Sequence, residues 1–133
     1  MTQALEAVPI TSAADIVAVR QKVRELSIQL KFSLVDQTKM VTAASELARN
    51  ALEHGKGGSC QMEIIKNGVR QGLRLVFQDQ GPGIADVELA MKDGYTTGSG
   101  LGLGLSGSKR LVNDFAIHSA PGQGTSVTIT RWK

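Results

Sequence analysis

Apolar residues in the first half of the chain recur at helical spacing. One set follows at steps of three and four and comprises Ile16, Val19, Val23, Leu26 and Leu30. This period predicts an amphipathic helix, and Ser12 followed by Asp15 resembles a capping box at its start. A second helix is predicted from Asp36, as its cap, to about His54, where Gly55 ends it.

The second half of the chain alternates between strand patterns and turn residues. The predicted strands are Ala7–Ile10, Cys60–Lys66, Gly72–Asp79, Phe115–Ser119 and Thr125–Arg131, and two further helices are predicted, from Asp86 to about Lys92 and from the glycine-rich stretch 94–104 to about Asn113. Asn67-Gly68 is a hairpin signal between the second and third strands. The order β-α-α-β-β-α-α-β-β predicts an α+β fold, a two-layer α/β sandwich with helices on one face of a mixed, mostly antiparallel sheet. We expect residues 1–133 to form a single domain.

Composition excludes several classes of function. A single cysteine, Cys60, rules out an internal disulfide and a cysteine-based zinc cluster. The first basic residue is Arg20 and no apolar run approaches the roughly 18 residues of a membrane span, so we expect a cytoplasmic protein with no membrane partner. The net charge is +3, the basic residues are scattered and aromatic residues are few, so nucleic-acid binding is not expected either.

The polar side of the second predicted helix carries the first candidate site. Glu46 and Asn50 are four residues apart and therefore project from one face, one turn apart. A carboxylate and an amide so placed can supply a base and a Mg²⁺ ligand, since Mg²⁺ prefers hard oxygen donors. The alternative is an ordinary solvated helix face.

Asp79 is the second candidate. Alternation along the strand places it on the same face as the apolar residues Leu73, Leu75 and Phe77. A carboxylate on a core face needs hydrogen-bond donors, and the exocyclic amine of adenine is one. Gly81 and Gly83 follow and would let a ligand approach the backbone. The alternative is an Asx turn in which Asp79 bonds its own backbone.

Thirteen of the fifteen glycines fall in four clusters, at 55–58, 81–83, 94–107 and 122–124. The densest, Gly98–Gly104, precedes a predicted helix and so favours phosphate binding. Two known phosphate motifs fit poorly: a dinucleotide fingerprint should follow a first strand, and a Walker A motif lacks its Lys-Ser/Thr pair here. A flexible linker is disfavoured because periodic structure resumes at once. The last cluster, with Thr125 after it, reads equally well as a hairpin turn.

Taken in order, these segments resemble the boxes of the GHKL superfamily of ATPases and kinases. Glu46-Leu-Ala-Arg-Asn50 resembles its N box, Asp79-Gln-Gly-Pro-Gly83 its G1 box, Gly98–Gly104 its G2 box and Gly122-Gln-Gly-Thr125 its last glycine box. Residues 8–132 are similar throughout to the anti-sigma regulatory serine/threonine kinases, and most of all to the RsbT-type switch kinases of the bacterial stressosome.

The resemblance implies a Bergerat fold that binds ATP and Mg²⁺. It assigns general-base catalysis to Glu46, Mg²⁺ coordination to Asn50, and recognition of the adenine amine to Asp79 with Thr125 nearby. It further implies that the base enters past Gly81 and Gly83 and that the phosphates are wrapped by Gly98, Gly100, Gly102 and Gly104. The implied partners are a STAS-domain protein, phosphorylated on serine or threonine, and a downstream enzyme such as a PP2C-type phosphatase.

Rival functions follow from the same resemblance. The chain could be an anti-sigma factor that binds a sigma factor and holds ATP as a structural ligand. A detached histidine-kinase catalytic domain is disfavoured because the sequence shows no dimerisation hairpin with an acceptor histidine, and a gyrase- or chaperone-type ATPase because it shows no transducer domain.

Overall fold

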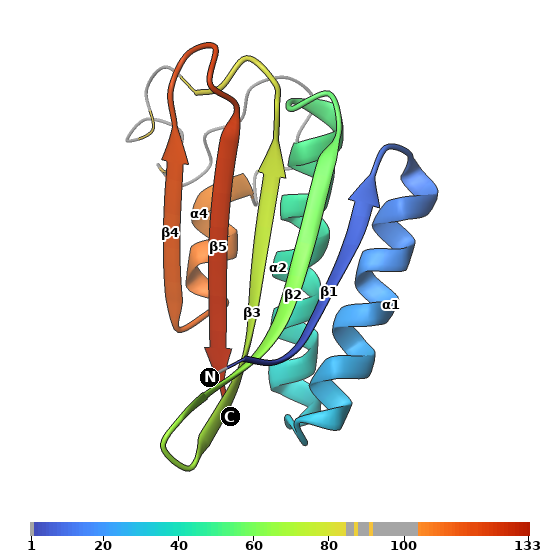
Figure 1. Cartoon of the computed structure of the whole chain (residues 1–133), viewed down its shortest axis with the longest axis vertical. Helices are drawn as coiled ribbons and strands as arrows, with labels where there is room; N and C mark the ends of the chain where they lie inside the picture. Colours follow the sequence, from blue (N-terminus) through green and yellow to red (C-terminus); the bar gives the residue numbers. More distant parts are fainter. Residues whose placement is uncertain (1, 85–86, 88–90, 92–103) are drawn as a thin grey trace.

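The computed structural model describes residues 2–84, 87, 91 and 104–133. Within these residues the chain forms five strands and three helices. They are β1 (Thr2–Ile10), α1 (Ala13–Gln29), α2 (Leu34–Glu53), β2 (Gly58–Asn67), β3 (Arg70–Asp79), α4 (Gly104–Arg110), β4 (Asp114–Ser119) and β5 (Thr125–Trp132). Figure 1 shows the helices together on one face of the sheet. The predicted α+β sandwich is therefore confirmed.

The five strands form one sheet in the order β1-β2-β3-β5-β4. Every pairing between them is antiparallel. α1 packs against β1 and α2, and α2 contacts β1, β2, β3 and β5. The opposite face of the sheet carries no helix in the part of the chain that the structure describes (Figure 1). The core accordingly lies between the helices and one side of the sheet.

Alternation along β3 determines which side chains enter this core. Leu73, Leu75 and Phe77 are buried, as the sequence pattern predicts. On the neighbouring strand β5, Ile129 pairs with Leu75 and Val127 pairs with Phe77, so each pair forms a row of buried side chains across the sheet. Directly paired residues of antiparallel strands share a face, so Asp79, the next residue along the row, faces the helix side at the end of the strand.

The helix starts differ in detail from the sequence prediction. Ser33, not Asp36, caps α2: its hydroxyl accepts a hydrogen bond from the Asp36 N–H at 3.1 Å. Asp36 instead occupies the first turn, where a negative charge favours the helix dipole. At α1, Ser12 is the N-cap residue but makes no side-chain cap. The Asp15 carboxylate accepts instead from the residue before the cap, from the Thr11 N–H at 2.8 Å and the Thr11 hydroxyl at 2.9 Å, so the predicted reciprocal capping box is not formed.

All five strands are longer than predicted; β2 runs from Gly58 to Asn67 and β4 begins at Asp114. β1 begins at Thr2 rather than Ala7 because the edge strand pairs with β2 along its whole length. β3 begins at Arg70 because it pairs with β2 as far as Asn67, and β5 ends at Trp132 because it pairs with Gly72 of β3. Pairing to a neighbour extends a strand beyond its own apolar pattern, and the sequence pattern does not record it.

Most of the predicted helix at 86–92, and the glycine stretch at 94–103, lie outside the described residues. One bond of that helix is present, from the Met91 N–H to the Val87 carbonyl at 3.0 Å. The last predicted helix is α4, which ends at Arg110 rather than near Asn113. Asn113 belongs to the sheet edge instead: its N–H donates to the Thr130 carbonyl at 2.9 Å.

Candidate functional site

The candidate residues converge at one end of the molecule. The C-terminal end of α2, the ends of β3 and β4 and the start of β5 meet at the top of Figure 1, away from the two chain termini. Asp79 pairs with Thr125, and Thr125 pairs with Ser119 on the far side. Three polar side chains therefore continue the buried apolar rows of the sheet at this end.

Glu46 lies on α2 and is not part of a solvated helix face. Its side chain is only 14% exposed, and its Oε1 accepts a hydrogen bond from Arg49 Nη1 at 2.8 Å. A carboxylate that is so covered is uncommon unless it is paired. The ion pair with Arg49 meets that requirement on one side of the carboxylate, which leaves the other oxygen for a proton donor.

Asn50 lies one turn further along α2 and is half-buried. Its carbonyl accepts from the N–H groups of His54 and Gly55, at 2.9 and 3.1 Å. Its side-chain amide makes no hydrogen bond to another described residue. The amide oxygen is thus available as a hard ligand of the kind that Mg²⁺ prefers.

Gly55 links the end of α2 to Asp79. A Cβ on Gly55 would lie 2.3 Å from Asp79 Cγ, and one on Gly81 would lie 2.6 Å from Gly55 Cα. Real Cβ atoms do not approach other heavy atoms so closely. The helix end, the Asp79 side chain and the turn after β3 are therefore in direct contact, and only glycine fits at the two positions. This contact joins the Glu46–Asn50 segment to the Asp79 segment.

The Asp79 carboxylate forms the Asx turn that was the alternative interpretation of this residue. Its Oδ1 accepts from the Gly81 N–H at 3.0 Å. One oxygen is thereby fixed by the chain itself, and no described residue donates to Oδ2. The turn and a binding role are therefore compatible, because the turn orients the carboxylate and leaves an acceptor.

The glycines of the turn have a structural explanation within the protein. Gly83 has a φ of +79°, and a Cβ there would lie 2.0 Å from the Ala120 carbonyl oxygen; a Cβ on Gly124 would lie 2.2 Å from the Asp79 carbonyl oxygen. Close backbone packing accounts for these glycines, as it does for Gly81. That they also admit a nucleobase stays a prediction.

Ser119 is a polar residue of this site that sequence reasoning missed. Its hydroxyl accepts from the Ile84 N–H at 2.8 Å, donates to the Gly124 carbonyl at 2.9 Å and contacts Thr125 Oγ1 at 2.8 Å. It thus holds the turn after β3 against the β4–β5 hairpin. The sequence feature that could have indicated Ser119 is its position at the end of a predicted strand, just before the last glycine cluster.

A cavity of about 640 Å³ lies at these strand ends. The cavity is open, and both faces of the sheet line it: Asp79, Thr125 and Ser119 from the helix side, and Gln78, Ser126 and His118 from the helix-free side. Glu46 and Asn50 do not line this cavity. The structure thus brings Asp79 and Thr125 together, and Gly55 connects them to the Glu46–Asn50 segment of α2.

Of the four glycines predicted to bind the phosphates, the structure describes only one. Gly98, Gly100 and Gly102 lie outside the described residues, and Gly104 is the first residue of α4. α4 packs on α2, and Ser108 on it is buried. The last glycine of the predicted loop therefore begins a helix that packs on α2.

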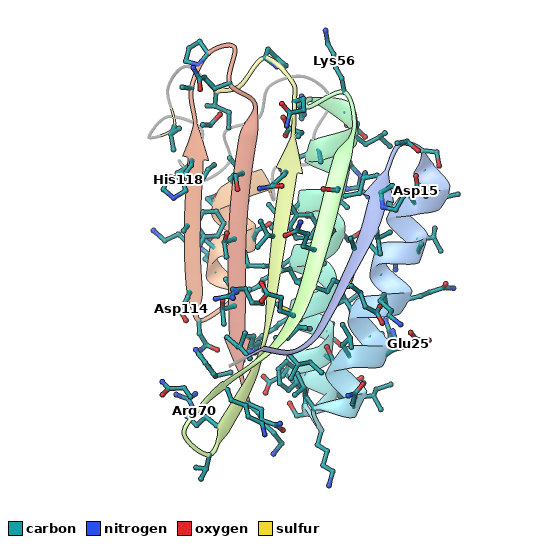
Figure 2. The ribbon with its side chains drawn as sticks, in the orientation of Figure 1. Asp15, Glu25, Lys56, Arg70, Asp114 and His118 are labelled. Carbon is teal, nitrogen blue, oxygen red and sulfur yellow. The ribbon has the colours of Figure 1, made fainter. Side chains whose placement is uncertain are left out.

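Other reactive side chains lie apart from this chemistry. Cys60 is fully buried on β2, and burial raises the pKa of its thiol, so it packs as a small apolar residue. His118 is exposed on β4 (Figure 2), and His54 is exposed at the end of α2. Among the described residues, no group of three or more His, Cys, Asp or Glu side chains could hold a metal ion. None of the helices in the described part is long and apolar enough to cross a membrane.

Comparison with known proteins identifies the family. Residues 35–133 match the family model of histidine kinase-, DNA gyrase B- and HSP90-like ATPases. The chain is 42% identical to the serine/threonine-protein kinase RsbT of Bacillus subtilis, over 89% of both chains. It is 32% identical to an anti-sigma F factor of Halalkalibacterium halodurans, over 77% of this chain and 74% of that protein.

Solved structures show the same fold. The structure of the RsbU and RsbW domains of a Mycobacterium tuberculosis protein superposes with a TM-score of 0.69 at 21% identity, covering 98% of this chain and 33% of that one. The mycobacterial sensor histidine kinase MprB superposes with a TM-score of 0.58 at 19% identity, covering 97% of each chain. The chain therefore belongs to the family of histidine kinase-, DNA gyrase B- and HSP90-like ATPases, in the branch that contains RsbT and the anti-sigma F factors.

Proposed function

We propose that this chain is an ATP-dependent protein serine/threonine kinase that phosphorylates a STAS-domain partner in a bacterial partner-switching pathway. The observation that carries the proposal is the Glu46 side chain, which is only 14% exposed. The same helix carries Asn50, and Gly55 at its end packs against Asp79. The 42% identity to a protein named serine/threonine-protein kinase supports the same activity.

Asp79 and Thr125 are proposed to bind the adenine. Both lie in one row at the strand ends and line the cavity of about 640 Å³. Asp79 Oδ1 is occupied by the Gly81 N–H, so Oδ2 is the acceptor for the exocyclic amine. Gly81 and Gly83 lie in the turn beside the base, and Gly98, Gly100, Gly102 and Gly104 are proposed to supply the backbone amides for the phosphates.

The Asn50 side-chain oxygen is proposed to hold Mg²⁺. Mg²⁺ usually takes only one or two protein oxygens and completes its shell with phosphate oxygens and water, so a single amide fits. When bound, the metal neutralises charge on the phosphates of ATP. The rest of phosphoryl transfer depends on alignment and on a positioned base.

Glu46 is proposed to be that base. Its carboxylate accepts the proton of the incoming serine or threonine hydroxyl as the oxygen attacks the γ-phosphorus; the bond from that phosphorus to the β,γ-bridging oxygen breaks and ADP leaves. Arg49 holds the carboxylate in place through the 2.8 Å contact. Both groups lie on the half-buried side of α2, where water is partly excluded and hydrogen bonds to charge are strong.

The partners are proposed from the resemblance to RsbT-type switch kinases. Phosphorylation of the STAS-domain protein would release the kinase, which then binds a downstream enzyme such as a PP2C-type phosphatase. We place this exchange in the cytoplasm, where ATP and the partner proteins occur. A second candidate function has its own support: the 32% identity to an anti-sigma F factor favours a protein that binds a sigma factor and uses nucleotide as a structural ligand.

A transfer assay tests the proposal. Purified protein is incubated with radiolabelled ATP, Mg²⁺ and each STAS-domain protein encoded beside its gene. Glu46→Ala should keep ATP binding but reduce transfer by about 10²- to 10⁴-fold, the usual contribution of a general base. Glu53→Ala is the matched control, because Glu53 is an exposed carboxylate on the same helix.

The outcomes separate the two functions. Label on a STAS serine or threonine, lost in Glu46→Ala and kept in Glu53→Ala, supports the kinase and the role of Glu46 together. Wild-type transfer by Glu46→Ala removes Glu46 as the base. ATP binding without any transfer favours the anti-sigma alternative, and co-purification with a sigma factor would then be the next measurement.

A further inference from the structure

Three large apolar side chains are exposed where α1 passes into α2. Ile28, near the end of α1, is 57% exposed, and Leu34 and Val35, in the first turn of α2, are 71% and 63% exposed. The turn that joins the two helices lies at the bottom of Figure 1, at the end of the molecule opposite the cavity. Apolar side chains that are exposed together, rather than singly, and rimmed by polar residues are typical of a protein interaction site.

Basic side chains surround this apolar group. Arg24 lies one turn before Ile28 on α1, and Lys39 lies one turn after Val35 on α2. Lys31 lies in the turn between the helices. None of the three basic side chains forms an ion pair with another residue that the structure describes. We call this set the turn surface; it comprises Arg24, Ile28, Lys31, Leu34, Val35 and Lys39.

Two acidic side chains that lie near the turn surface in sequence are already paired elsewhere. Glu25 contacts Lys22 at 3.4 Å, and Asp36 accepts from Arg131 at 2.6 Å. They are therefore engaged with other cations rather than with the basic rim. The positive charge of the turn surface is thus left for a second molecule, and the complement of an apolar group with a basic rim is an apolar group with an acidic rim.

Lys31 occupies a backbone position that favours glycine. Its φ is +62°, in the left-handed region. Its N–H donates to the Ile28 carbonyl at 2.9 Å, and the Phe32 N–H donates to the Ser27 carbonyl at 3.0 Å. These are the two bonds of a Schellman motif, in which glycine is the usual residue at this position. A lysine here strains the backbone, so its long basic side chain is not explained by the stability of the turn.

We propose that the turn surface docks a partner protein through a face of apolar side chains ringed by carboxylates, and that this partner is the downstream enzyme. The apolar centre supplies the anchors, and the basic rim steers the association. Glu46 lies twelve residues along α2 from Leu34, about 18 Å away at the rise of an α-helix. A partner docked here need not reach the proposed base, which suits an enzyme that receives no phosphate. The inference rests on the proposed partner exchange and adds to it the surface and its chemistry.

The experiment measures binding of the full chain to the PP2C-type phosphatases of the same organism by biolayer interferometry, at several salt concentrations. The wild-type association rate should fall as salt rises, because ions screen the attraction between the basic rim and the carboxylates. Val35→Ser should weaken the affinity about tenfold, as removal of one apolar anchor does. Val69→Ser is the matched control, because Val69 is a fully exposed valine between β2 and β3, and it should bind as wild type does.

Lys31→Gly separates binding from folding. It relieves the left-handed backbone, so it should unfold at a urea concentration at least as high as wild type. Its association rate with the phosphatase should nevertheless be lower than that of wild type and less dependent on salt. Lys56→Gly is the matched control: Lys56 also has a positive φ, +60°, but lies at the opposite end of the molecule (Figure 2), and its removal should leave the association rate unchanged.

The outcomes separate the inference from the proposed function. Phosphatase binding that is unchanged in Val35→Ser and Lys31→Gly, or an association rate that does not vary with salt, would overturn the inference alone. So would a loss of STAS-domain binding in these variants with phosphatase binding intact, or self-association of the wild type that Val35→Ser abolishes, because another molecule would then occupy the surface. If the wild type binds no such phosphatase, the proposed partner exchange fails together with the inference, while the transfer assay still decides the kinase activity.

Discussion

Substituting Gly55 by alanine tests the contact that joins the two halves of the candidate site. The added Cβ would lie 2.3 Å from Asp79 Cγ and 2.5 Å from Asp79 Oδ2. Carbon atoms in contact are normally about 3.5–4.0 Å apart. The Asp79 carboxylate, or the end of α2, must therefore move by more than about 1 Å to accommodate a single methyl group.

Two opposing terms set the stability of this variant. Replacing glycine by alanine restricts the unfolded chain and stabilises by about 0.4–1 kcal/mol where the backbone allows it. Overpacking costs about 1–3 kcal/mol. The overlap is severe and involves the main part of a fixed side chain, so the second term wins. We expect a net loss of about 1–2 kcal/mol in the free energy of unfolding, measured with urea.

The larger effect should be on nucleotide affinity. A hydrogen bond to a charged group contributes about 1.5–3 kcal/mol, so displacing the Asp79 carboxylate from the amine should weaken ATP binding about 10- to 100-fold. Calorimetric titration with ATP and Mg²⁺ measures it. Gly55→Ala added to Asp79→Asn should cost little more than Asp79→Asn alone, because both changes act through the same carboxylate.

Gly68→Ala is the comparison for an added methyl group without a collision. A Cβ on Gly68 meets nothing within 4 Å, although its φ of +64° adds some strain. Its ATP affinity should match wild type. If Gly55→Ala bound ATP as tightly as wild type does, then either the contact with Asp79 does not hold the carboxylate or Asp79 does not bind the nucleotide, and the reasoning would be refuted.

Two further predictions concern the rest of the fold. Arg131 donates to Asp36 Oδ1 at 2.6 Å and to the Leu111 carbonyl at 3.0 Å, and its side chain is only 15% exposed. Arg131→Met should therefore lower the free energy of unfolding, measured with urea, by about 2 kcal/mol. An unchanged urea midpoint would show that these contacts between β5, α2 and the end of α4 do not stabilise the fold. Hydrogen bonds from the Thr11 N–H and hydroxyl lower the pKa of Asp15 from its ordinary value. Its contribution to stability is therefore present above the unfolded-state pKa and is lost as the pH falls through the lowered folded-state pKa. NMR titration should find the Asp15 pKa higher in Thr11→Val than in wild type, and equal values would contradict the hydroxyl contribution.

The sequence by itself determined the class of fold and much of the candidate site. Helical and alternating periods record which side of each element is buried, so α1, α2 and the five strands could be predicted in order. The same alternation placed Asp79 in line with Phe77 on the core face, and the structure bears this out. The glycine clusters predicted that a ligand approaches the backbone at Gly81 and Gly83; the chain's own backbone lies against both glycines, and the approach of a ligand stays a prediction.

Only the tertiary structure decided which distant residues meet. Ser119 contacts Ile84 across 35 residues of sequence, and Arg131 reaches Asp36 across 95. Such contacts depend on strand register and on how α2 ends against β3, and no local period records either. The same reason explains why β1 extends to Thr2, whereas the Ser33 cap of α2 is a local contact between residues three apart. The periodic pattern in the sequence records whether each single residue is buried. A binding site depends instead on contacts between side chains that are distant in sequence, and only the assembled sheet and helices bring these together.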